Sequence, residues 1–134
     1  MKKKKEKKSG KKLLKINKNN DITSTIELFQ HFENKYEIIT ATLENGIQYE
    51  TGDMKITQTF TKTILHTNIN KMIKKLKKHD KITIMVIENM KRNKTNDKII
   101  DEKIKKLKEL KNVRIKRIKQ KNTYKTLAAI IEGV

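Results

Sequence analysis

The chain contains no cysteine, no proline and no tryptophan. Without cysteine there is no disulfide, no thiolate zinc site and no cysteine nucleophile. The three histidines, His31, His66 and His79, include no i,i+4 pair and none adjoins a glutamate, so their spacing does not favour a metal site. We therefore expect neither a metal nor any other cofactor.

Glycine is also scarce, with only Gly10, Gly46, Gly52 and Gly133 in the chain. These positions leave no G-x-x-x-x-G-K-[ST] phosphate loop and no G-x-S-x-G nucleophile elbow. No apolar run approaches the roughly 20 residues of a membrane helix. The start M-K-K-K-K-E-K-K-S-G-K-K lacks both the apolar stretch of a signal peptide and the arginine-rich pattern of an import peptide. The sequence thus predicts no enzyme, no small-molecule substrate and no membrane contact.

Acidic residues are outnumbered, with 34 Lys and Arg against 15 Asp and Glu and a net charge of +19. A compact chain with so much charge of one sign is expected to bind a polyanion, because Lys and Arg displace the counterions of nucleic acid. Residues 23–53 are the exception, with one lysine against six acids. Because aromatic residues are few, base stacking is not the evident binding mode, which favours lysine–phosphate contacts and recognition of folded RNA by shape.

Composition divides the chain into a basic N-terminal arm (1–22), a single α/β domain (23–120) and a C-terminal tail (121–134). The arm holds ten lysines and few apolar residues. It cannot bury enough surface to offset the entropy of ordering, so we expect it to be disordered until it contacts RNA.

Periodicity predicts a mixed α/β sheet with helices packed on it, in the order β-β-β-α-β-α-β. Three antiparallel strands come first, with Asn45-Gly46 as a hairpin turn. The near-continuous apolar run K-I-T-I-M-V-I-E predicts a strand buried on both faces. The expected strands are 25–32, 36–43, 47–51, 81–88 and 113–118, and the expected helices are 59–78 and 97–110.

This order of elements also resembles the nuclease fold of the RNase H type. That fold needs several carboxylates that converge on metal ions. Residues 54–79 contain no Asp or Glu, and Glu88 has no evident helical partner. Asp97 and Asp101 are explained by the preference for acids at a helix N-terminus. A nuclease is therefore not the expected function.

The acidic stretch, residues 23–53, contains a motif made up of Phe32, Asn34, Ile38, Thr40, Gly46 and Gly52. Through these positions it resembles the small-subunit ribosomal protein family S-eleven, the platform protein of ribosomes. The basic, threonine-containing loop that follows in the family is similar to residues 55–63. The glycine-rich loop and the C-terminal tail of the family are replaced here by residues 89–96 and 122–134. The resemblance covers residues 22–120. The matching positions are Phe32, Asn34, Ile38, Thr40 and Gly46 in the family's first hairpin, and Gly52 at the glycine that closes its third strand.

The resemblance implies a structural rRNA-binding protein of the small ribosomal subunit, active in translation. Its partners would be small-subunit rRNA and neighbouring proteins of the S-eighteen and S-seven types, with no homo-oligomer. The lysine-rich and isoleucine-rich composition indicates an AT-rich coding sequence, and hence a mitochondrial ribosome or the cytoplasmic ribosome of an AT-rich organism. The alternative function is a free-standing basic RNA- or DNA-binding accessory factor.

The expected RNA contacts are the basic and threonine residues of the arm, of two loops, and of the last strand with the tail. They are Lys2, Lys3, Lys4, Lys5, Lys7, Lys8, Lys11, Lys12, Lys55, Thr57, Thr59, Lys62, Lys91, Arg92, Lys94, Arg114, Lys116, Arg117, Lys119, Lys121 and Lys125.

Overall fold

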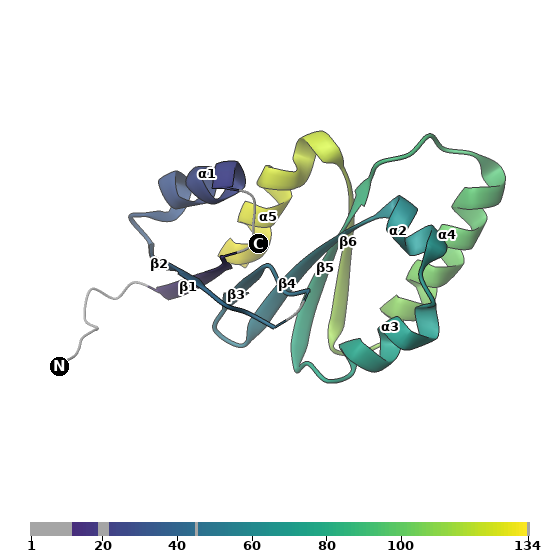
Figure 1. Cartoon of the computed structure of the whole chain (residues 1–134), viewed down its shortest axis with the longest axis horizontal. Helices are drawn as coiled ribbons and strands as arrows, with labels where there is room; N and C mark the ends of the chain where they lie inside the picture. Colours follow the sequence, from purple (N-terminus) through teal and green to yellow (C-terminus); the bar gives the residue numbers. More distant parts are fainter. Residues whose placement is uncertain (1–11, 19–21, 45, 134) are drawn as a thin grey trace.

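The computed structural model describes residues 12–18, 22–44 and 46–133, which form a six-stranded mixed sheet with helices on both faces (Figure 1). The strand order is β2-β1-β3-β4-β5-β6. Strand β3 runs antiparallel to both of its neighbours, and the other neighbouring strands are parallel. The predicted α/β class, a mixed sheet with helices packed on it, is confirmed. The strands are β1 (Lys12–Asn17), β2 (Tyr36–Ala41), β3 (Tyr49–Thr51), β4 (Met54–Phe60), β5 (Lys81–Glu88) and β6 (Val113–Lys119).

Two groups of helices cover the two faces of the sheet (Figure 1). One face carries α1 (Ile22–Phe32) and α5 (Thr123–Glu132), and the other carries α2 (Thr61–His66), α3 (Ile69–Leu76) and α4 (Lys94–Lys108). A short 3-10 helix, η1 (Gln120–Asn122), joins β6 to α5. Among the described residues, no helix is both long enough and apolar enough to cross a membrane.

Each face of the sheet has its own apolar core. Removal of this apolar area from water is the main term that holds the helices to the sheet. The core under α1 and α5 includes Leu14, Ile16, Phe32, Met85 and Ile131. The core beneath α2, α3 and α4 includes Ile64, Leu76, Ile84, Ile100 and Leu107.

Strand β5 was predicted to the residue because its pattern is unambiguous. Residues 82–87 are all buried, and they contribute to the cores on both faces. A central strand that is covered on both faces has a continuous apolar sequence.

The first predicted strand, residues 25–32, is wrong, since this segment lies within helix α1. Leu28 and Phe32 are four residues apart and both fully buried, as one face of a helix requires. Residues 12–17, assigned to the basic arm, form β1, in which Leu14 and Ile16 are buried. Consequently β2 pairs in parallel with β1 across a helical crossover, and the predicted three-stranded meander does not form.

The predicted basic loop at residues 55–63 is also wrong, because most of it is strand β4. Its threonines and glutamine follow the buried Ile56, a pattern that suits a strand as well as a loop. The single helix predicted over 59–78 is two helices, α2 and α3. Asn68 separates them by capping α3, where its side chain accepts from the backbone N–H groups of Asn70 and Lys71.

The elements after β5 lie close to their predicted positions. Helix α4 begins earlier than predicted because Asn93 caps it by accepting from the backbone N–H of Asn96. The predicted tail forms helix α5, whose apolar side packs into the first core. Its buried residues are Leu127, Ala128, Ile130 and Ile131.

Candidate nucleic-acid interface

Five strands run in the same direction, so their carboxyl ends meet at one edge of the sheet, which we call the carboxyl edge. Helices α2 and α4 follow strands that end there, and α5 follows β6 through η1 (Figure 1). All three helices therefore begin at this edge. In open α/β sheets it is the usual place for ligands.

Each of these helices carries a lysine in its first turn: Lys62 in α2, Lys94 in α4 and Lys125 in α5. The N-terminal end of a helix is already positive, so a cation there is unfavourable unless an anion lies nearby. Helices α2 and α5 have no acid in the first turn. The edge therefore concentrates positive potential from side chains and helix ends together, the condition that attracts phosphate.

More lysines extend this surface along the loop after β5 and along the end of β6. Phe60, which ends β4 at the same edge, is 39% exposed. Phe60 was not predicted from the sequence as part of a binding surface. The only sign of it in the sequence is an apolar residue directly after the polar run T-Q-T. The carboxyl-edge lysines, all exposed and without an acidic partner among the described residues, are Lys62, Lys91, Lys94, Lys119, Lys121 and Lys125.

The loop after β5 is fixed to the start of α2 by Asn89. Its side-chain oxygen accepts from the hydroxyl of Thr61 and from the backbone N–H of Lys62, both at 3.1 Å. The Thr61 hydroxyl in turn accepts from the Asn89 backbone N–H at 3.2 Å. These bonds hold the loop that carries Lys91 near the helix that carries Lys62. Arg92 of this loop is engaged, since its Nε donates to Asp97 at 3.0 Å.

Arg117, predicted to contact RNA, is instead occupied inside the protein. Its Nε donates to Glu88 at 2.5 Å, and its Nη1 donates to Asp101 of α4. Burial works to lower the pKa of Arg117, but the hydrogen bonds to Asp101 and Glu88 outweigh it and raise that pKa. The charged guanidinium of Arg117 on β6 therefore links this strand to β5 and to α4.

The predicted RNA contacts on β4 are either bonded to other groups of the protein or half-buried. Lys55 pairs with Glu44 at 3.1 Å, and this hydrogen bond holds the pKa of the Glu44 carboxyl below its ordinary value. The hydroxyl of Thr57 donates to the backbone oxygen of Gly46, and Thr59 is half-buried. None of these three side chains adds to the surface that the carboxyl-edge lysines form.

The remaining predicted contacts lie elsewhere. Lys12 and Arg114 are near the opposite edge of the sheet, where the parallel strands begin, and Lys116 lies in the middle of β6. The predicted contacts of the arm before them, Lys2, Lys3, Lys4, Lys5, Lys7, Lys8 and Lys11, lie outside the described residues.

Comparison with known proteins finds likeness at the level of structure. No protein-family profile matches the sequence, and no curated protein matches it. XPF from Aeropyrum pernix in complex with DNA superposes with a TM-score of 0.68 and 13% identity, over 92% of this chain and 62% of that one. A second structure of XPF from Aeropyrum pernix gives a TM-score of 0.65 and 14% identity, over 90% of this chain and 58% of that one. The chain thus spans less than two thirds of the length of either XPF chain.

These matches overturn the ribosomal interpretation. The resemblance to the S-eleven family was wrong, and with it the predicted role in the small subunit and the predicted rRNA, S-eighteen-type and S-seven-type partners. It rested on a three-stranded meander whose three segments are helix α1, strand β2 and strand β3 in the structure, with β1 between β2 and β3 in the sheet. The alternative, a free-standing basic factor that binds nucleic acid, fits the matches better.

The same matches contradict the prediction that the chain is not an enzyme. The mitochondrial location stays a prediction. An identity of 13–14% establishes the fold alone, and in that fold this chain is similar to XPF over about nine tenths of its length.

Proposed function

We propose that this chain is a DNA-binding protein that holds DNA by its phosphates along the carboxyl edge. The observation that carries the proposal is the likeness of its fold to a DNA-bound XPF over 92% of the chain. The exposed carboxyl-edge lysines support it, because they supply the charge that such a contact needs.

Physical chemistry favours this edge over the rest of the basic surface. Lys74 and Lys75 lie in the last turn of α3, where they complement the negative end of the helix dipole. The first-turn lysines of α2, α4 and α5 instead lie at the positive N-terminal ends of their helices, which repel them. A phosphate backbone at this edge would relieve that repulsion, whereas the α3 lysines need no ligand.

The proposal is tested by fluorescence anisotropy with labelled linear duplex DNA, branched DNA and duplex RNA at several salt concentrations. Binding to DNA should weaken with salt, with a log–log slope of about 0.9 per phosphate contact. The triple variant Lys62→Gln/Lys91→Gln/Lys94→Gln should bind at least about tenfold more weakly and reduce that slope by about two to three.

The matched control removes the same charge from a different part of the surface. Lys74→Gln/Lys75→Gln/Lys105→Gln changes exposed lysines on α3 and α4. Its DNA affinity should remain within about threefold of the wild type, since these lysines would act only through screened long-range charge. Equal loss in both variants would show that the carboxyl edge is not the interface. Absence of any salt-dependent DNA binding would refute the function itself.

A second candidate, metal-dependent DNA cleavage, is favoured by the likeness to XPF. Within residues 12–18, 22–44 and 46–133, no group of three or more His, Cys, Asp or Glu side chains could hold a metal ion. We therefore assign no residue to a cleavage step. Incubating the whole chain with labelled branched DNA and Mg²⁺ or Mn²⁺, with EDTA as the control, tests this candidate directly.

A further inference from the structure

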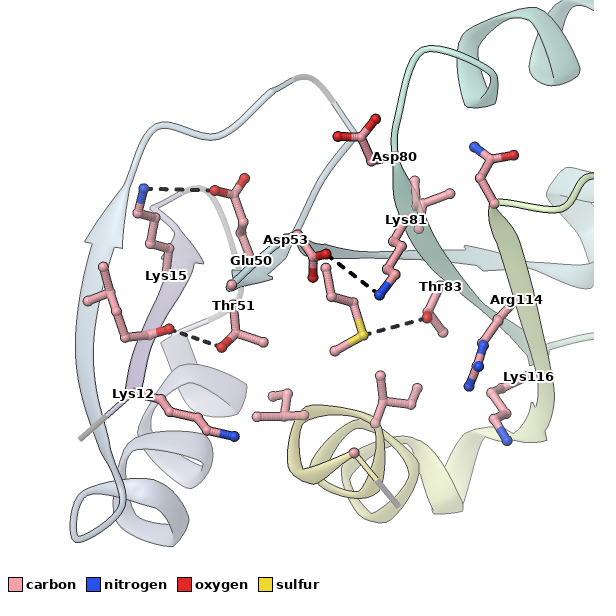
Figure 2. Close-up of a pocket in the computed structure, with 18 of the residues that line it drawn as sticks. Lys12, Lys15, Glu50, Thr51, Asp53, Asp80, Lys81, Thr83, Arg114 and Lys116 are labelled. Carbon is pink, nitrogen blue, oxygen red and sulfur yellow. Dashed lines mark hydrogen bonds and ion pairs between the residues drawn. The ribbon is translucent and has the colours of Figure 1, made fainter. Parts of the chain in front are cut away.

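A large cavity lies near the opposite edge of the sheet, on the face that α5 covers (Figure 2). Its volume is about 970 Å³, near the upper end of the range for small-molecule sites in proteins. It is bounded by the start of β1, the turn between β3 and β4, the starts of β5 and β6, and the end of α5.

The cavity is basic, because six cationic side chains line it against three acidic ones. Two of the cations are paired, Lys15 with Glu50 at 3.8 Å and Lys81 with Asp53 at 3.6 Å. In Figure 2, Lys12 lies on one side of the cavity, and Arg114 and Lys116 lie on the other. The cations without an acidic partner among the described residues are Lys12, Lys111, Arg114 and Lys116.

Arg114 and Lys116 are charged residues on a sheet face that otherwise carries an apolar core. They alternate with Val113 and Ile115, which belong to the core on the other face, so they point to the same face as Ile118 beneath α5. Both side chains are exposed, so they lie on the part of this face that α5 leaves uncovered. Neighbouring cations on this face repel each other, and an anion in the cavity would relieve that repulsion.

The cavity also has an apolar lining with one polar group that lacks a good partner. Met54, Ile130 and Ile131 line it together with Thr83, which is only 4% exposed. The hydroxyl of Thr83 donates to the sulfur of Met54 at 3.9 Å, and a thioether is a weak acceptor. A buried hydroxyl normally has a stronger partner, so this one is available to a ligand in the cavity.

We propose that this cavity binds a phosphorylated nucleotide, with the phosphate held by Arg114 and Lys116 and the base on the apolar lining beside Thr83, which pairs with Arg114 across β5 and β6. The ligand chemistry is a phosphate ester attached to a planar, partly apolar body. Two sources supply it: a free nucleotide and the phosphorylated end of a nucleic-acid strand. The site is separate from the carboxyl edge, so this proposal and the proposed function can fail independently.

The test measures binding of a fluorescent 5′-phosphorylated mononucleotide to the whole chain, with the matching nucleoside as the ligand control. The nucleotide should bind at least about tenfold more tightly than the nucleoside, since hydrogen bonds to a charged group are worth a factor of this order. Arg114→Gln/Lys116→Gln should abolish that preference. Thr83→Val, which nearly keeps the volume of the side chain, should weaken nucleotide binding and leave the preference for phosphate in place.

Variants at the two edges separate this site from the DNA contact. Lys91→Gln/Lys94→Gln should weaken duplex DNA binding and leave nucleotide binding unchanged, and Arg114→Gln/Lys116→Gln should do the reverse. Equal affinity for nucleoside and nucleotide overturns the proposal, and so does a nucleotide affinity that Arg114→Gln/Lys116→Gln leaves unchanged.

Single-stranded oligonucleotides with and without a 5′-phosphate identify the source of the ligand. Tighter binding of the phosphorylated oligonucleotide than of the mononucleotide supports the site and assigns it to a strand end. Tighter binding of the mononucleotide supports the site and assigns it to a free nucleotide. Failure of both phosphorylated probes to compete for the cavity overturns the proposal, whatever the result with duplex DNA.

Discussion

The ammonium of Lys103 on α4 lies 2.8 Å from the backbone oxygen of Leu65 near the end of α2. It also donates to the backbone oxygens of Thr67 at 2.8 Å and Ile64 at 3.1 Å. The last carbonyls of a helix have no partner within it, and they form its negative end. One side chain from a neighbouring helix therefore closes α2 and fixes the break between α2 and α3.

Replacing this side chain should destabilise the fold. Lys103→Met keeps the apolar stem but deprives three carbonyls of their charged donor, so we expect the free energy of unfolding to fall by about 2 kcal/mol. Urea denaturation followed by circular dichroism measures it. The control Lys106→Met, at an exposed position of the same helix, should change the value by no more than about 0.5 kcal/mol. Equal effects would show that the ammonium does not stabilise the end of α2.

Lys103 also shows which parts of the fold lie beyond sequence reasoning. The buried stripe of α4, including Ile100, Ile104 and Leu107, follows from helical periodicity. The role of Lys103 does not, because its partners are backbone atoms of a distant segment. Helix α1 was missed for a related reason. Its threonine, isoleucine and phenylalanine favour a strand by propensity, and only packing of Leu28 and Phe32 selects the helix.

Arg117 and Arg114, on opposite faces of β6, should respond to mutation in opposite ways. Arg117→Gln leaves Glu88 and Asp101 without their shared partner, and we expect it to lower the free energy of unfolding by about 1 to 3 kcal/mol. DNA affinity of the folded fraction should not change. Arg114→Gln removes an exposed cation without an acidic partner among the described residues, so stability should hold within about 0.5 kcal/mol.

Thermal unfolding and DNA anisotropy on both variants check this pair of expectations. Loss of DNA affinity in folded Arg117→Gln would contradict the assignment of Arg117 to an internal tie and restore its predicted role as a nucleic-acid contact.

The same two residues explain how much of the candidate site could be predicted from the sequence. The alternation V-R-I-K-R-I-K predicts a strand with basic positions, but it cannot say which cation has a carboxylate opposite. Glu88 precedes Arg117 by 29 residues, and only the parallel pairing of β5 with β6 brings them together. The carboxyl-edge lysines were all predicted as contacts, because net charge and loop position suffice to find exposed cations. Their common edge depends on β4 being a strand, whereas a loop was predicted from the sequence of that segment.

The fold should lose stability in acid through the contact between α1 and α5. Glu132 of α5 accepts from His31 of α1 at 3.0 Å, and this hydrogen bond lowers the pKa of the Glu132 carboxyl below its ordinary value of 4.5. A carboxyl whose pKa is lower in the folded state stabilises that state above its ordinary pKa, and this contribution is lost as the pH falls through the folded-state pKa. The free energy of unfolding should therefore decline from about pH 4.5 downward, in part through Glu132.

Denaturation curves at several pH values, compared between the wild type and Glu132→Gln, measure how much Glu132 contributes to this loss of unfolding free energy. The variant should be less stable than the wild type at neutral pH and should converge with it in acid. The matched control is Glu109→Gln, at an exposed position without an ion pair among the described residues. A difference between wild type and Glu132→Gln that stays constant with pH would rule out the ionised contact.

The turn between β3 and β4 depends on the backbone of Gly52, whose φ is +59°. This turn joins Thr51 to Met54, which pair across the two strands, and it forms part of the cavity wall. An added Cβ would meet no heavy atom within 4 Å beyond the adjoining residues. Gly52→Ala should therefore cost only the strain of a left-handed conformation, about 1 kcal/mol of unfolding free energy. Gly52→Asn should cost less, because asparagine tolerates this conformation better than alanine does. Urea denaturation of both variants measures the two costs, and a cost for asparagine equal to or above that for alanine would show that backbone strain is not what selects glycine at this turn.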